Sequence, residues 1–100
     1  MRRQTPPFDS KAAELLAIEA LSFLAEEAER LGRFLALTGI SPAEIRSQAH
    51  APRFLAAVLD YIAGDESLLL DFAGRTGRDP SEVGRARLRL GGPAWEADTA

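Results

Sequence analysis

The chain has 100 residues, a formal net charge of −3 at pH 7 and 46% hydrophobic residues, a composition typical of one small globular domain. It has no cysteine, which excludes disulfides, thiolate catalysis and cysteine-based metal sites. The longest uncharged apolar run, residues 54–59, is far shorter than the roughly 20 residues that a membrane span needs, and the N-terminus lacks a signal-peptide pattern. We therefore expect a cytoplasmic protein.

Helical spacing of apolar residues runs through the chain from residue 10 onward and predicts an all-α fold. Residues 1–9, which include Pro6 and Pro7, are predicted to form a flexible arm, and Asp9 or Ser10 to cap the first helix. On the outer surface of this helix we expect Glu26 to pair with Arg30 one turn later. The residues predicted for its buried side are Leu15, Leu16, Ile18, Ala20, Leu21, Phe23, Leu24 and Ala25.

A second helix is predicted over residues 31–38, and it ends at Gly39. The sequence Ser41-Pro42-Ala43-Glu44 is a capping box with proline at the first helical position, so we predict a short helix near 42–49.

The second half of the chain repeats this order of elements. A helix starts at Pro52 and stops at Gly64, another follows to Gly77, and a last one opens at residues 79–82. The inward residues predicted for these three helices are Leu55, Val58, Leu59, Ile62, Leu69, Phe72, Ala73, Val83, Ala86 and Leu90.

The corner "TGISPAEI" at residues 38–45 recurs 38 residues later as "TGRDPSEV" at 76–83. The same shift aligns inward residues, helix stops and caps, which indicates two tandem copies of a three-helix unit, about 10–50 and 51–92. We predict that the two copies pack as one compact six-helix bundle over 10–92, followed by a C-terminal tail, 93–100.

Four motifs together resemble a small, uncharacterised all-helical bacterial domain family of unknown function. The motifs are "ERLGRFLALTGISPAEIR", "PRFLAAVLDYI", "DESLLLDFA" and "ARLRLGG". The resemblance covers roughly residues 14–93 and implies a helical fold, but it assigns no catalytic or binding residues.

Charge is distributed unevenly, because residues 9–29 are mostly acidic and residues 75–89 mostly basic. The candidate partner- or phosphate-binding surface consists of Arg75, Arg78, Arg85 and Arg89. We expect Glu82, on the same helical face, to neutralise Arg85. The preferred function is a small non-enzymatic protein-interaction or adaptor module acting through the last helix; a homodimer, in which this helix meets the acidic half of a second copy, is left open.

The alternative function is a nucleic-acid-binding regulator that uses residues 65–90 as a helix-turn-helix-like unit. Each corner departs from that motif, the first by bulky Leu35 and the second by Arg78 in the turn. Trp95 is either packed against the bundle or a partner anchor. The lone His50 and the dispersed carboxylates predict no metal site, no cofactor and no enzymatic activity.

Overall fold

A computed structural model describes residues 9–90, and this part of the chain forms six helices and no strand. The helices are α1 (Ser10–Ala25), α2 (Ala28–Thr38), α3 (Pro42–Gln48), α4 (Pro52–Ala63), α5 (Glu66–Thr76) and α6 (Ser81–Leu90). The predicted all-α fold and the order of its elements are thereby confirmed. Trp95, the N-terminal arm and the C-terminal tail lie outside the described residues.

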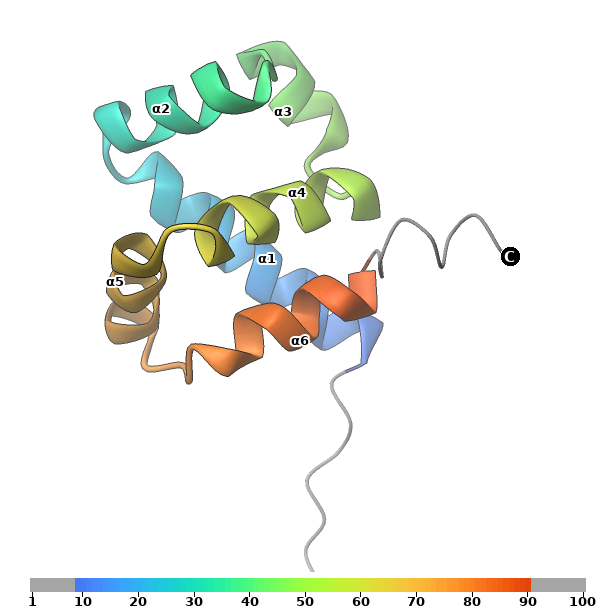
Figure 1. Cartoon of the computed structure of the whole chain (residues 1–100). Helices are drawn as coiled ribbons and strands as arrows, with labels where there is room; N and C mark the ends of the chain where they lie inside the picture. Colours follow the sequence, from blue (N-terminus) through green and yellow to red (C-terminus); the bar gives the residue numbers. More distant parts are fainter. Residues whose placement is uncertain (1–8, 91–100) are drawn as a thin grey trace, which may run out of the picture.

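The centre of the molecule is a layer of three helices, α1, α4 and α6, which pack against one another. α1 passes behind α4 and α6 in the view of Figure 1, while α2 and α3 follow one edge and α5 another. α2 packs against α1, and α5 against α4. The core is almost entirely aliphatic and aromatic, and its largest fully buried side chains are Phe34, Phe72, Leu16, Leu24, Leu55, Leu59, Ile62, Val58 and Val83.

α1 begins where the sequence predicts, because the Asp9 carboxylate accepts a hydrogen bond from the Ala12 N–H at 2.8 Å. Its buried side is narrower than predicted. Leu15 is 57% exposed and Ala25 is exposed, so their assignment to the buried side was wrong. Both residues lie on the outer side of α1, opposite the face that α4 and α6 cover.

The two repeated corners end the preceding helix in a similar way. Gly39 and Gly77 end α2 and α5 with φ of +76° and +74°, a left-handed conformation in which an L side chain is strained. In the turn before each glycine, a threonine hydroxyl donates to a phenylalanine carbonyl four residues back: Thr38 to Phe34 at 2.7 Å and Thr76 to Phe72 at 2.8 Å. The duplication itself stays a prediction.

The helices that follow the two corners differ in how they pack. α6 buries Val83 and Ala86 against α1 and α4, whereas α3 buries no side chain. The capping box predicted for α3 is present, with the Glu44 N–H donating to Ser41 Oγ and the Ser41 N–H donating to Glu44 Oε1. α3 is therefore held by local bonds at its start, while α6 is part of the core.

The described helices include none that is long and apolar enough to cross a membrane. The longest, α1, has 16 residues, against roughly 20 for a membrane span.

Candidate functional site

The basic segment that the sequence singled out lies against the acidic first helix. Arg75 at the end of α5 forms an ion pair with Glu26 at 3.0 Å, and Arg78 in the α5–α6 corner forms one with Glu19 at 2.8 Å. Two of the four candidate arginines therefore connect α1 to the α5–α6 corner. The acidic segment and the basic segment of the sequence therefore contact each other through two ion pairs.

Arg78 is the centre of this contact. Its Nε and Nη2 donate to the two carboxylate oxygens of Glu19, and its Nη1 donates to Glu82 at 2.8 Å. These hydrogen bonds and charges lower the pKa of Glu19 and raise the pKa of Arg78. Glu82 faces Arg78, so the expectation that it neutralises Arg85 gains no support.

Arg87 and Arg30 form further contacts with partners that the sequence did not predict. Arg87 on α6 pairs with Asp60 on α4. The Arg30 guanidinium donates to the Phe23 carbonyl at 2.7 Å, lies over the Phe23 ring and pairs with Glu27. The predicted pair between Glu26 and Arg30 is wrong, because the chain turns sharply after α1 and directs Glu26 toward Arg75.

The outward face of α6 is an accessible part of the candidate surface. Arg85 and Arg89 are exposed and lie one turn apart on this face. Leu88 lies beside them with 59% of its surface exposed, and an added side chain at Gly84 would meet nothing within 4 Å. The result is an apolar side chain flanked by two arginines on a helix whose opposite side is part of the core. Leu88 was not among the candidates, although its helical spacing placed it opposite Val83 and Ala86.

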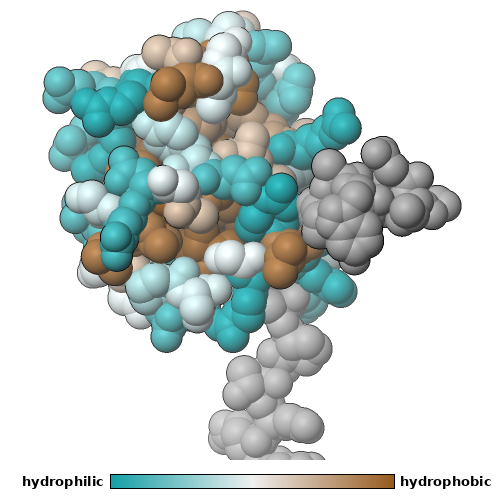
Figure 2. Space-filling model, viewed as in Figure 1, coloured by the Kyte–Doolittle hydropathy of each residue, from teal (hydrophilic) through white to brown (hydrophobic). Residues whose placement is uncertain are grey.

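Figure 2 shows the face on which α4 and α6 lie in front. Apolar residues on this face are interspersed with hydrophilic ones, and the two kinds alternate over short distances.

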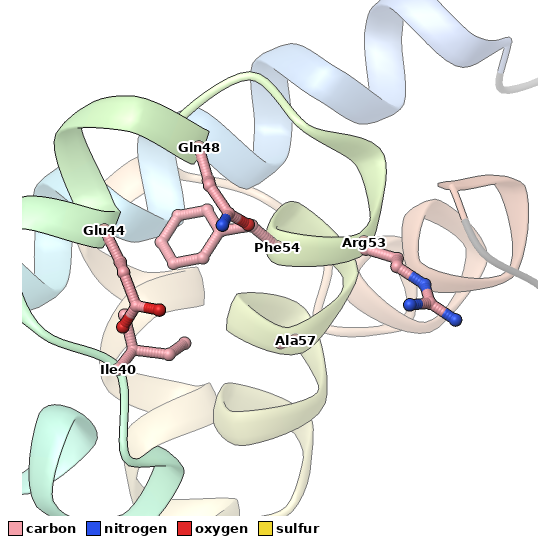
Figure 3. Close-up of a pocket in the computed structure, with 6 residues that line it drawn as sticks. All are labelled: Ile40, Glu44, Gln48, Arg53, Phe54 and Ala57. Carbon is pink, nitrogen blue, oxygen red and sulfur yellow. The ribbon is translucent and has the colours of Figure 1, made fainter.

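A second candidate site is a groove between α3 and α4. It has a volume of about 180 Å³ and is lined by Ile40, Glu44, Gln48, Arg53, Phe54 and Ala57. Figure 3 shows the Phe54 ring at its base, Glu44 and Gln48 extending from α3, and Arg53 on the α4 side pointing away from the ring. The sequence reasoning missed this groove, because it exists only where α3 stands apart from α4.

Within the described residues, no three histidine, aspartate or glutamate side chains are grouped so that they could hold a metal ion. His50 is exposed just after α3. Trp95, for which packing on the bundle and a role as partner anchor were both left open, lies outside the described residues.

The sequence pattern of one protein family, described as "Protein of unknown function (DUF3572)", matches residues 10–93. The chain belongs to this family. The matched range includes all six helices, both repeated corners and the whole α3–α4 groove. The predicted resemblance to a helical family of unknown function is confirmed. No curated protein and no solved structure matches the chain.

Proposed function

We propose that this chain is a non-enzymatic protein-interaction module that binds an acidic partner through the outward face of α6. The observation that carries the proposal is the exposed Leu88, which lies beside Arg85 and Arg89 on a helix anchored by Val83 and Ala86. A buried leucine at the centre of a contact supplies affinity, and flanking charges supply orientation and a faster association rate.

Arg75 and Arg78, the other two candidate arginines, also stabilise the fold. Arg75 and Arg78 have carboxylate partners on α1, so their loss weakens the packing of this chain as well as any binding. Arg85 and Arg89 are exposed on the outward face of α6, next to Leu88.

The experiment is affinity capture from lysate of the source organism, with and without nuclease. We expect the double variant Arg85→Ala/Arg89→Ala and the single variant Leu88→Ser each to lower recovery of the captured protein at least fivefold. Arg33→Ala/Arg46→Ala is the matched control, because both arginines are exposed on other helices. Equal recovery with the α6 variants and the control would reject the α6 surface.

The same experiment separates the proposal from nucleic-acid binding, for which the spacing of Arg85 and Arg89 is also suitable. Capture that nuclease abolishes, together with duplex binding that weakens steeply as salt is added, would replace the protein partner with nucleic acid. Capture that survives nuclease supports a protein.

A further inference from the structure

The α3–α4 groove has the composition of a small binding site. Its base is the ring of Phe54, which is 5% exposed, and its apolar walls come from Ile40 and Ala57. Phe54 is held from below by an edge-to-face contact with Phe34, at 6.4 Å between ring centroids. The base of the groove is thus part of the core, although the groove itself is open to solvent.

The size of the groove suits one aromatic side chain. An apolar protein cavity of about 150 Å³ binds a benzene molecule, and this groove measures about 180 Å³. A phenyl ring that enters would contact the Phe54 ring and replace water on Ile40 and Ala57.

The polar groups around the groove indicate what flanks that ring. Glu44 is already engaged, because one of its carboxylate oxygens accepts the Ser41 N–H at 2.8 Å. Arg53 is exposed, and within residues 9–90 it forms no ion pair with a carboxylate. The rim therefore has an acidic side chain, Glu44, on the α3 side and a basic side chain, Arg53, on the α4 side.

We propose that the α3–α4 groove binds a partner segment in which an aromatic side chain is followed directly by a carboxylate. The ring enters between α3 and α4, and the carboxylate crosses the α4 rim to Arg53. The Gln48 amide, on the opposite rim, is placed to hydrogen-bond the main chain of the bound segment. This site is separate from the outward face of α6 and does not depend on the function proposed for that face.

The experiment is a titration of the full, ¹⁵N-labelled chain, followed by amide chemical shifts. The probes are two capped dipeptides, acetyl-Phe-Glu-amide and acetyl-Phe-Lys-amide. We expect saturable shifts at the amides of Ile40, Gln48 and Ala57, and binding of the Glu probe about two- to fivefold tighter than that of the Lys probe at low salt. High salt should remove this preference.

Three variants complete the experiment. Arg53→Ala should abolish the preference for the Glu probe, while Arg46→Ala, an exposed arginine of α3 that does not line the groove, should retain it. Ala57→Leu places a larger side chain in the groove and should abolish the shifts with both probes. If Ala57→Leu fails to fold, the Arg53 and Arg46 pair still decides the question.

The proposal is overturned if the probes shift residues elsewhere, if both probes bind equally, or if Arg53→Ala keeps the preference. If the chemical shifts of the groove amides change with protein concentration in the absence of a probe, the groove binds a second copy of this chain instead. Shifts produced by Trp95→Ala without any probe would assign it to this chain's own Trp95. Either result would overturn a separate partner segment.

Discussion

α3 and α6 follow corners with similar sequences and a glycine of nearly equal positive φ, yet α6 buries two side chains in the core and α3 buries none. At equivalent positions of the two repeats, α6 has Val83 and Ala86, whereas α3 has Ile45 and Gln48. Val83 is 1% exposed and Ala86 fully buried, while Ile45 is half-buried and Gln48 exposed. Small apolar side chains let a helix approach its neighbours closely, and a long polar side chain in the same place would bury an amide.

The difference shows that a corner determines where a helix starts but not what it packs against. Both helices begin with local hydrogen bonds that involve a glutamate, Glu44 in α3 and Glu82 near the start of α6. α6 packs against both α1 and α4, whereas α3 lies outside this three-helix layer, next to the groove. Each of the following experiments alters one part of this contrast.

The largest effect on the free energy of unfolding is expected from exchanging Ala86 of α6 and Gln48 of α3, which occupy equivalent positions after the two corners. Ala86→Gln places a longer, polar side chain in the core, and we expect it to lower the free energy of unfolding by about 3 kcal/mol. The equivalent change in the first unit, Gln48→Ala, should change it by less than about 0.5 kcal/mol, since Gln48 is exposed. Urea unfolding of both variants measures the difference. Similar values for the two would show that α3 and α6 are equally packed.

A smaller and equal effect is expected at the two glycines that end α2 and α5. Gly39→Ala and Gly77→Ala each add a methyl group that meets nothing within 4 Å, so the cost comes from the positive φ alone. We expect about 1 kcal/mol for each variant, with the two values within about 0.5 kcal/mol of each other. Thermal or urea unfolding tests this, and a clear inequality would mean that one corner is supported by contacts beyond its own turn.

The smallest effect concerns the ion pairs of Arg78, which takes the place of Ile40 in the repeat. We expect Arg78→Ala to cost at most about 1 kcal/mol, because Glu19 is 45% exposed and solvent weakens the pair. Ile40→Ala changes the equivalent position of the first corner, and urea unfolding of both variants compares their losses in the free energy of unfolding.

The same pair predicts a pH dependence. The pKa of Glu19 is lower in the folded chain than its ordinary value of 4.5, because Arg78 donates hydrogen bonds to the ionised form. The resulting stability is fully present above pH 4.5 and is lost as the pH falls through the lower, folded value. Below pH 4.5 the free energy of unfolding of the wild type should therefore fall more steeply with decreasing pH than that of Glu19→Gln. Equal pH dependence of the free energy of unfolding in the two proteins would contradict a stabilising Glu19–Arg78 pair.

The sequence by itself determined the helices and the corners, because these depend on neighbours within a few residues. The Asp9 cap, the Ser41–Glu44 capping box and the positive φ of Gly39 and Gly77 are local properties, and all are observed. The same local reasoning placed most of the buried residues, since helical spacing defines a face. The prediction for Leu15 was wrong, because helical spacing does not determine how much of the circumference of α1 the neighbouring helices cover.

The partners of the charged side chains and the groove were decided only by the tertiary structure. Glu19 and Arg78 are 59 residues apart in the sequence, and their contact depends on how the α5–α6 corner reaches α1. The groove depends on α3 lying at the edge, outside the layer of α1, α4 and α6. Which of the two helices packs in the core depends on contacts between residues far apart in the chain, and no window of neighbouring residues contains these contacts.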